Sequence, residues 1–263
     1  MKDVSRIALY TVSNDNYAEV TAVMLYSFLF NNSWFDGDIV IICDNGERCR
    51  LSDVNRAWFS SLYEKVLFYE ANPREYDKIV LHTREMGANV LYSMLFYKLE
   101  IFRGFKYDQI VFLDSDIVVD KGIKELFYNN ETTIMAVEDG LKPLSGYFNS
   151  GVMSIPMRYI DRGIFSKMID LCENYGSDSF SNICSNNGIS MDQDIINEVV
   201  EDVRIVGEEY NFSPYFFGEP NNKVKIFHYY GGHKPWLDHC EFKRGYLPYY
   251  RYYYMLTHNF KKN

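Results

Sequence analysis

A chain of 263 residues with 47% apolar content is long enough to bury a sizeable core, and this composition excludes a disordered or fibrous protein. Its 27 Lys and Arg against 36 Asp and Glu give a net charge of −9, which argues against general nucleic-acid binding because that depends on neutralising phosphates. No apolar run approaches the ~20 residues that span a bilayer, and Ile7–Val12 is too short for a signal-peptide core. We therefore expect a cytoplasmic chain whose cysteines, which form no CxxC pair, are reduced thiols.

The first half of the chain alternates short apolar runs with helical patterns. The runs that predict strands are Ile7–Val12, Ile39–Cys43, Val66–Tyr69 and Ile110–Leu113. The patterns that predict helices are Tyr17–Phe30, Val54–Leu62 and Val90–Phe102. Strands and helices in alternation favour an α/β fold, with a largely parallel sheet that helices cover on both sides.

The pattern loosens after Asp116. The strands predicted there are Thr133–Val137, Phe148–Ile155 and Val224–His228. The helices predicted there are Asp161–Tyr175, with Asp161 as its N-cap, and Met191–Val200, separated by the Ser- and Asn-rich loop Ser177–Ser190. Because no internal repeat or linker is evident, we expect a single compact domain over residues 1–240 and a Tyr-rich basic tail over 241–263.

The sharpest local feature is V-F-L-D-S-D-I-V-V-D at 111–120. Strand periodicity predicts that Asp114 and Asp116 share one face at the carboxyl end of a buried strand, where open α/β sheets bind ligands. Neighbouring carboxylates repel each other, so the pair favours a divalent cation and an anionic ligand. Oxygen ligands suit Mg²⁺ or Mn²⁺. The alternative to a metal site is that Asp114 and Asp116 are two solvated acids at the end of a strand.

The second feature is H-Y-Y-G-G-H-K-P-W at 228–236. A neutral His228 imidazole is a ready third metal ligand beside two carboxylates. Gly231 and Gly232 let backbone approach a phosphate closely, and Lys234 adds positive charge for a diphosphate. A structural histidine is the alternative for His228 alone, but His, Gly and Lys on one loop favour a metal and phosphate site.

Two other functions fit parts of this pattern. Phosphatases of the haloacid-dehalogenase type also end an apolar strand in DxD, but there the motif usually opens the chain, whereas 113 residues precede Asp114 here. A metal-dependent phosphatase or sugar-nucleotide hydrolase therefore stays as the alternative. A non-catalytic sugar-nucleotide-binding protein is the third hypothesis, and the complete set of expected ligands argues against it.

Together the two motifs resemble those of glycosyltransferase family 8, the retaining enzymes that include glycogenin and bacterial lipopolysaccharide galactosyl- and glucosyltransferases. The resemblance covers residues 6 to about 240 and implies a GT-A fold, with residues 1–120 as the nucleotide-binding half and 121–240 as the donor-sugar and acceptor half. It also implies a UDP-hexose donor, glucose or galactose being favoured, and Mn²⁺ with Mg²⁺ as the alternative. The residues that match the family's DxD and HxxGxxKPW motifs are Asp114, Ser115, Asp116, His228, Gly231 and Lys234.

Further segments fit the same resemblance. T-V-S-N-D-N-Y at 11–17 matches the opening strand and turn that cradle uridine, and F-N-S-G-V at 148–152 matches a segment near the donor sugar. The uridine-side residues implied are Val12, Asn14, Asp15 and Tyr17. The sugar-side residues implied are Asn149 and Ser150, the donor-holding Lys98, an acid that is Glu138 or, as we favour, Asp139, and Asp192 and Gln193 beneath the anomeric face.

The resemblance implies retention of configuration. A double displacement would need a carboxylate on the opposite sugar face, for which Asp192 is the candidate. A front-face path needs no such group, and we favour it, with Asp192 and Gln193 positioning the sugar.

We expect the acceptor to be a saccharide or glycolipid. The candidate residues that line its binding site are Ser177–Ser190 and the aromatic cluster Tyr215, Phe216 and Phe217. The tail mixes aromatic residues with cations, which suits peripheral contact with the inner face of an anionic membrane. The alternative is a packed C-terminal helix. The cations of the tail are Lys243, Arg244, Arg251, Lys261 and Lys262.

Overall fold

The computed structural model describes residues 6–46, 49–85, 90–104, 106–129, 132–140, 146–160, 163–174, 191–237 and 243–260. Four parts of the sequence predictions lie outside these ranges, namely the N-cap Asp161, the helix end Tyr175, the loop Ser177–Ser190 and the cations Lys261 and Lys262. Every predicted donor, metal and catalytic residue lies inside them.

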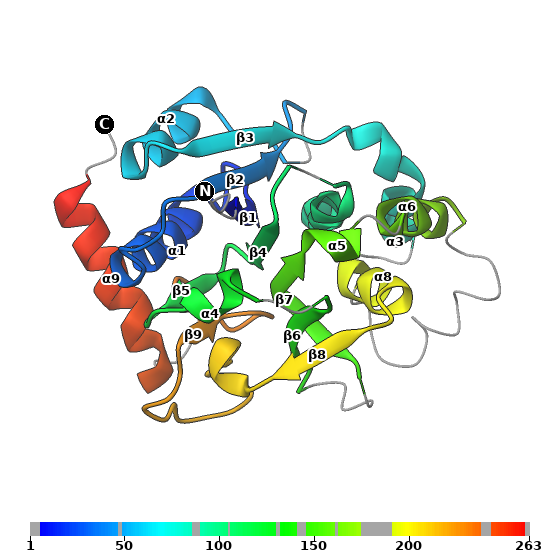
Figure 1. The fold of residues 1–263 in the computed structure, drawn as a ribbon. Helices are drawn as coiled ribbons and strands as arrows, with labels where there is room; N and C mark the ends of the chain where they lie inside the picture. Colours follow the sequence, from blue (N-terminus) through cyan, green and yellow to red (C-terminus); the bar gives the residue numbers. More distant parts are fainter. Residues whose placement is uncertain are drawn as a thin grey trace, which may run out of the picture.

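A seven-stranded mixed sheet forms the centre of the molecule, in the order β3-β2-β1-β4-β7-β6-β8 (Figure 1). In that order the strands are Val66–Glu70, Asp38–Cys43, Ile7–Val12, Gln109–Leu113, Phe148–Pro156, Ile134–Glu138 and Val203–Val206. The first four run parallel, β7 is antiparallel to both β4 and β6, and β8 is parallel to β6. The expected α/β fold with a mostly parallel sheet is confirmed, and β7 is the strand that makes the sheet mixed.

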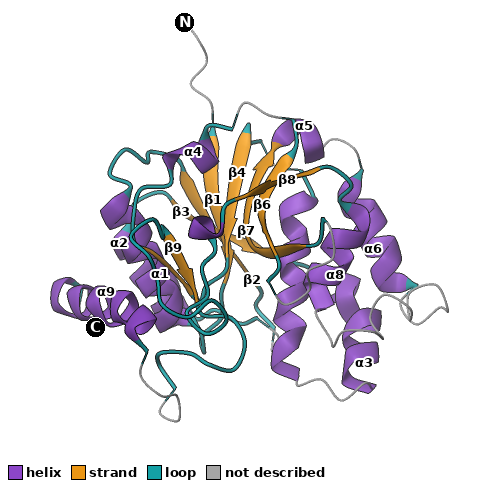
Figure 2. Ribbon diagram, turned by 90° about the horizontal axis from the view of Figure 1, so that it is seen from below, coloured by secondary structure: helices purple, strands orange, loops and turns teal. Residues whose placement is uncertain are grey.

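Helices cover both faces of the sheet (Figure 2). On one side lie α1 (Ala18–Asn31), α2 (Asp53–Leu62) and α9 (Leu247–Asn259). On the other lie α3 (Asp77–Glu85), α6 (Ile164–Glu173), α8 (Met191–Val199) and the 3-10 helix η2 (Val90–Phe102). Shorter helical segments are η1 (Pro73–Tyr76), α4 (Lys124–Phe127), α5 (Met157–Ile160), η3 (Glu208–Tyr210) and η4 (Arg244–Tyr246).

Strand β1 contributes side chains to two hydrophobic cores, one on each face of the sheet. Its alternate residues point to opposite faces, so Leu9 joins Phe28 and Phe59 in one core, whereas Tyr10 joins Tyr97 in the other. All residues of the strand are buried. Burial on both faces explains why the sequence of this strand is a continuous apolar run rather than an alternation.

Helix η2 carries two charged residues into the interior. Lys98 is 4% exposed and Glu100 is fully buried. The Glu100 carboxylate accepts hydrogen bonds from the Tyr76 hydroxyl at 2.8 Å and from Arg103 Nε at 2.6 Å. Glu100 is therefore satisfied within the fold, whereas Lys98 is directed to the edge of the sheet that is described below.

A second sheet joins two distant segments. Strand β5 (Ile117–Val119) pairs antiparallel with β9 (Ile226–His228), and Ile117 lies opposite His228. The segment at Phe212 extends this pairing, because the Phe212 carbonyl accepts from the His228 N–H at 2.9 Å. The small sheet thereby places His228 beside the turn that precedes β5.

The Tyr-rich tail forms α9 and packs against α1. Its buried residues are Tyr249, Tyr252 and Leu256. Asn31 of α1 donates to the Tyr252 hydroxyl at 2.7 Å, and Arg251 pairs with Asp120. The described part of the tail is thus a packed helix, the alternative left open by the sequence. Among the described residues, none of the helices has the length and apolar character to span a bilayer.

Candidate active site

The two motif carboxylates lie in a turn between β4 and β5 rather than on a strand. The sequence argument from strand periodicity is therefore wrong, although its conclusion that the two acids lie together is right. The turn is held at both ends: the Asp114 N–H donates to the Gly151 carbonyl at 2.9 Å, and the Asp116 carbonyl accepts from the Tyr229 N–H at 3.0 Å. Ser115, between the two acids, is buried.

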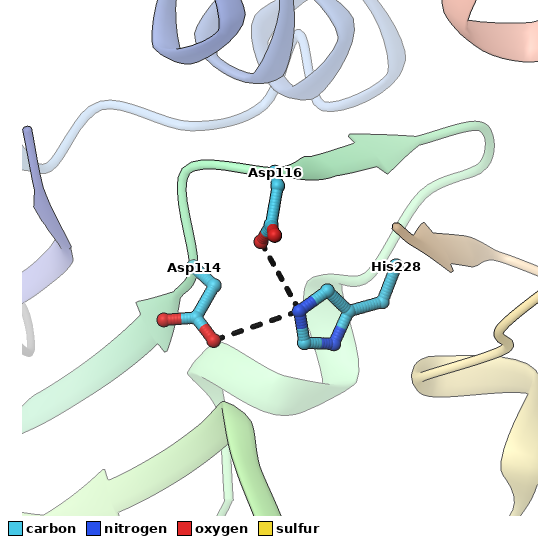
Figure 3. Close-up of side chains that lie close together, drawn as sticks. All are labelled: Asp114, Asp116 and His228. Carbon is cyan, nitrogen blue, oxygen red and sulfur yellow. Dashed lines mark hydrogen bonds and ion pairs between the residues drawn. The ribbon is translucent and has the colours of Figure 1, made fainter. Parts of the chain in front are cut away.

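Asp114, Asp116 and His228 converge on one point (Figure 3). The Nε2 atom of His228 lies 3.1 Å from Asp116 Oδ1 and 3.5 Å from Asp114 Oδ2. One ligand atom from each residue falls within 4.8 Å of the others. Two carboxylates and an imidazole are a donor set for Mn²⁺ or a similar divalent cation, so these residues fit the metal expected from the sequence.

Lys98 lies behind Asp114 in a buried position. Its Nζ atom is 3.0 Å from Asp114 Oδ1, 2.8 Å from Asp192 Oδ2 and 3.1 Å from the Ser150 hydroxyl. Burial disfavours the charged form of Lys98 and acts to lower its pKa. The two carboxylates outweigh this effect, so the pKa of Lys98 is raised. The ammonium also lies 5.2 Å from the centroid of the Phe112 ring. The structure therefore places Lys98 beside the metal-ligand cluster, where it contacts Asp114, Asp192 and Ser150.

Lys234 reaches Asp116 from the loop after β9. Its Nζ atom lies 2.5 Å from Asp116 Oδ2 and 2.9 Å from the Tyr229 carbonyl. Burial works to lower the pKa of Lys234, but Asp116 raises it, with a further contribution from Tyr17. Gly231, in the same loop, has φ of 79°, a conformation that favours glycine.

The two carboxylates differ in their pKa values. Burial raises the pKa of Asp114, and the neighbouring Asp116 adds to this effect against the opposing charge of Lys98. Burial also acts to raise the pKa of Asp116, but Lys234 and His228 outweigh it and hold that pKa well below its ordinary value. Asp116 is therefore the better stabilised anion of the pair.

The predicted sugar-side residues form one hydrogen-bonded group. Gln193 accepts at Oε1 from the Ser150 N–H at 3.0 Å and donates through Nε2 to Asp139. The Ser150 hydroxyl in turn donates to Asp192 Oδ2 at 3.4 Å. Of the two acids left open by the sequence, Asp139 is buried in this group, whereas Glu138 is exposed. The structure thus brings Asp139, Ser150, Asp192 and Gln193 together.

The predicted uridine-side residues follow β1 at the same edge of the sheet. Strands β1 and β4 are parallel neighbours with Tyr10 opposite Phe112, so Val12 lies near the level of Asp114. The Asn14 side chain accepts from the Tyr17 N–H at 3.0 Å and shapes this turn.

Asp15 has a structural partner that the sequence did not suggest. Its Oδ1 accepts from the N–H and hydroxyl of Ser52, both at 2.8 Å, and from Asn55 at 2.7 Å, at the start of α2. Asp15 therefore ties the β1 turn to the N-terminus of that helix.

Two residues that the sequence did not single out complete the site. A Cβ on Gly151 would lie 2.2 Å from His228 Cε1 and 2.8 Å from Asp114 Oδ2, so only glycine leaves room for the ring. A glycine inside a strand pattern is a signal for such close approach. Asn211, whose Oδ1 lies 2.7 Å from His228 Nδ1, carries no comparable signal, because it lies in an irregular segment.

An aromatic surface extends from the cluster toward solvent. The Tyr230 ring lies 4.7 Å from His228 and stacks on Phe216 at 5.0 Å. Further out, Tyr215 packs edge-on against Phe216 and stacks on His233 at 3.7 Å. Tyr215 and Phe216 of the predicted acceptor wall thus lie beside the metal-ligand loop, whereas Phe217 packs toward the core.

The DxD turn and its ligand cluster at the carboxyl edge of a mixed sheet define a glycosyltransferase of the GT-A fold. A family model described as "Glycosyl transferase family 8" matches residues 8–240. The chain therefore belongs to glycosyltransferase family 8, and the resemblance seen in the sequence is confirmed.

Solved structures of glycosyltransferases have a similar fold. The galactosyltransferase LgtC, in complex with donor and acceptor sugar analogues, superimposes with a TM-score of 0.71 at 19% identity, over 95% of this chain and 96% of that one. The bifunctional glycosyltransferase WbbM gives 0.69 at 21% identity, over 96% of this chain and 50% of WbbM. GlyE of Streptococcus pneumoniae gives 0.66 at 18% identity, over 95% of this chain and 60% of GlyE. A search of the curated proteins finds no match.

Proposed function

We propose that the protein transfers a hexose, glucose or galactose being favoured, from a UDP-sugar to a hydroxyl group of an acceptor. The observation that carries this proposal is the convergence of Asp114, Asp116 and His228, with a lysine on each carboxylate. A divalent cation flanked by lysines is suited to a nucleoside diphosphate leaving group. Membership of the family supports the same class of reaction.

Asp114, Asp116 and His228 would hold Mn²⁺, with Mg²⁺ as the alternative. When bound, the metal supplies Lewis-acid stabilisation of the negative charge that grows on UDP as the glycosidic bond breaks. Lys234 contacts Asp116 from a loop, so we expect it to move to the diphosphate when the donor binds. Lys98 stays in place and adds a fixed positive charge on the other side of the cluster.

The contacts of Asp192 support a front-face path with retention. A double displacement needs a carboxylate free to attack the anomeric carbon, but Asp192 is 2.8 Å from Lys98 and also accepts from Ser150. The Gln193 amide is engaged at both ends by Ser150 and Asp139. We therefore assign Asp192 and Gln193 to positioning the sugar, while the leaving phosphate accepts the proton of the acceptor. An Asp192→Asn variant with full activity would exclude Asp192 from a covalent role.

The proposed acceptor is a saccharide or glycolipid of the kind found in bacterial glycans such as lipopolysaccharide. The aromatic surface formed by Tyr230, Phe216 and Tyr215 supports this choice, because sugar rings pack well on aromatic faces. It begins next to His228, so an acceptor stacked there would lie close to the donor.

Peripheral contact with the inner face of a membrane remains part of the proposal. Leu247, Tyr250 and Tyr254 are 51%, 41% and 62% exposed and follow the helical spacing of one face of α9. Since Tyr252 and Leu256 of the same helix are buried, deletion of the tail would damage the core. Sedimentation with anionic vesicles should therefore compare the wild type with a Tyr250→Ser, Tyr254→Ser variant, and equal binding would contradict membrane contact.

The experiment that tests the proposed function is donor hydrolysis. The purified protein is incubated with UDP-, GDP- and ADP-sugars, with Mn²⁺ or with a chelator, and free nucleoside diphosphate is measured. We expect Mn²⁺-dependent release of UDP from one donor and loss of this release in an Asp116→Ala variant. Release of inorganic phosphate without UDP would instead indicate a hydrolase, and silence with every donor would contradict a donor site.

A further inference from the structure

We propose that Asn211 is a positioning residue for the metal ligand His228, and that it fixes which ring nitrogen faces the two carboxylates. The proposal rests on the proposed function, because it concerns the metal site of that function. Asn211 lies between η3 and the bridge at Phe212, and it is 2% exposed. Its side chain contacts Nδ1 of His228, whereas Nε2 of the same ring faces Asp116.

A chain of three hydrogen bonds leads from the backbone of β7 to His228. The Gly151 N–H lies 3.0 Å from Asn149 Oδ1, and the same oxygen lies 2.8 Å from Asn211 Nδ2. Asn211 Oδ1 then lies 2.7 Å from His228 Nδ1. Asn149, Asn211 and His228 are all buried, at 9%, 2% and 1% exposure.

The direction of this chain follows from its first member. A backbone N–H can only donate, so Asn149 must present its oxygen to Gly151. Because that same oxygen faces Asn211, Asn211 must present its NH₂ group to Asn149 and therefore its oxygen to His228. An amide oxygen can only accept, so Nδ1 of His228 carries a proton.

The consequence reaches the metal-ligand cluster. With Nδ1 protonated, the lone pair of a neutral imidazole lies on Nε2. This is the atom that points to Asp116 Oδ1 at 3.1 Å and Asp114 Oδ2 at 3.5 Å. Gly151 contributes twice, since its N–H sets the direction of the chain and its missing side chain leaves space for the ring.

Metal-bound histidines generally donate their second N–H to an oriented acceptor, and loss of that acceptor weakens metal binding by about 10- to 100-fold. Asn211 provides such an acceptor without adding a negative charge next to a buried ring. It also explains why Asn149, a strand residue, is buried with its oxygen turned away from solvent. Asn211 and Asn149 would therefore be needed for metal binding without contacting the metal.

The test is a double-mutant cycle on Mn²⁺ affinity, measured with UDP present from the free Mn²⁺ signal in electron paramagnetic resonance. Asn211→Leu keeps the approximate volume and removes the acceptor. We expect it to weaken Mn²⁺ binding by about 10- to 100-fold in the wild-type background. In a His228→Ala background the same change should alter the affinity by less than about twofold, because its effect passes through His228.

Two further variants separate positioning from general stability. Asn211→Asp keeps an oxygen toward Nδ1 and loses the bond to Asn149, so we expect most of the Mn²⁺ affinity to return while the melting temperature stays below that of the wild type. Asn197→Leu is the matched control: it breaks two hydrogen bonds to the backbone of Phe148 and one to the Gln193 carbonyl, none of which reaches His228, and should lower the melting temperature without changing Mn²⁺ affinity.

Three results would overturn the inference. One is an Asn211→Leu variant that melts earlier but binds Mn²⁺ like the wild type. Another is an equal loss of affinity with and without His228. If the wild type binds no Mn²⁺ in the presence of UDP, the metal site itself fails, and the inference fails with it. The first two results leave the proposed function intact.

Discussion

The two carboxylates of the DxD turn are separated by one residue, yet their surroundings differ. Asp114 faces Lys98, which belongs to the buried helix η2 and also pairs with Asp192. Asp116 faces Lys234, which belongs to a loop with the positive-φ glycine Gly231. The first lysine lies on a buried helix of the main fold, whereas the second lies in a loop after the short strand β9.

This difference indicates a division of roles. Lys98 pairs with two carboxylates at once, the half-buried Asp114 and the buried Asp192, whereas His228 Nε2 lies further from Asp114, at 3.5 Å. Among the described residues, Lys234 pairs with Asp116 alone, and Asp116 and His228 would hold the metal together once Lys234 has left. We infer that the Asp114 side of the site is permanent, and that the Asp116 side exchanges its lysine for metal and diphosphate.

The largest expected effect on activity is that of Gly151→Ala, which disturbs Asp114 and His228 at once. The new Cβ would overlap the His228 ring and crowd Asp114. Loss of a bound metal removes several kcal/mol of transition-state stabilisation, so UDP release should fall by about 10³-fold. The assay is Mn²⁺-dependent UDP release, accompanied by circular dichroism to check the fold.

Gly122→Ala is the control for this variant, because a Cβ there meets nothing closer than 3.5 Å. It should behave like the wild type. Unchanged Mn²⁺-dependent activity in Gly151→Ala would contradict the arrangement of Asp114 and His228.

Lys98→Met should show the largest loss of stability. It leaves the half-buried Asp114 and the buried Asp192 without their common cation, and breaking a buried pair costs about 3 kcal/mol or more. Urea denaturation measures the change in the free energy of unfolding. Adding Asp192→Asn to this variant should restore part of the loss, because one unpaired charge is removed. An unfolding free energy equal to that of the wild type would show that Lys98 is not part of the fold's permanent side.

Lys234→Met should do the opposite and lower activity far more than stability. Because Lys234 pairs with one carboxylate rather than two, we expect the unfolding free energy to fall by only about 1 kcal/mol. The rate of UDP release should fall by roughly 10²-fold, as for the loss of one group that stabilises developing charge. Stopped assays at saturating donor, paired with urea denaturation, measure both quantities. A variant as unstable as Lys98→Met would remove the distinction between the two lysines.

Asp15 lies outside the metal-ligand cluster. We expect Asp15→Asn to have the smallest effect, which is on stability. Burial opposes ionisation slightly, but hydrogen bonds from Ser52 and Asn55 hold the pKa of Asp15 below its ordinary 3.8. A lowered pKa stabilises the fold above pH 3.8, and this contribution is lost as the pH falls through the lower value of the folded state. The variant should lose about 0.5 kcal/mol at pH 7, and the difference should shrink below pH 4. A pH-independent difference would argue against the charge effect.

Much of the fold could be predicted from local sequence patterns. Strands β1, β2 and β4 are buried on both faces and give clear apolar runs, so their positions were predicted to within one residue. Helix α3 and strand β8 were not predicted, since β8 is a short edge strand with two exposed residues and little periodicity. Val90–Phe102 was predicted with the correct bounds, but it forms a 3-10 helix rather than an α-helix.

The site was predicted in its residues but not in its geometry. The motifs identified Asp116 and His228, which are 112 positions apart. Their meeting depends on the pairing of β5 and β9, two three-residue strands that are too short to give a periodic signal. The role of Asn211 could not be predicted for the same reason, because it depends on contacts made only after these distant segments pair.

The most direct test of these roles is a crystal structure of the protein with Mn²⁺ and UDP. We predict that Mn²⁺ lies between Asp114, Asp116, the Nε2 atom of His228 and the diphosphate. Lys234 should have left Asp116 for a phosphate oxygen, while Lys98 keeps its contacts with Asp114 and Asp192. A metal bound elsewhere, or a Lys98 that moves while Lys234 stays on Asp116, would contradict both the site and the division of roles between its two sides.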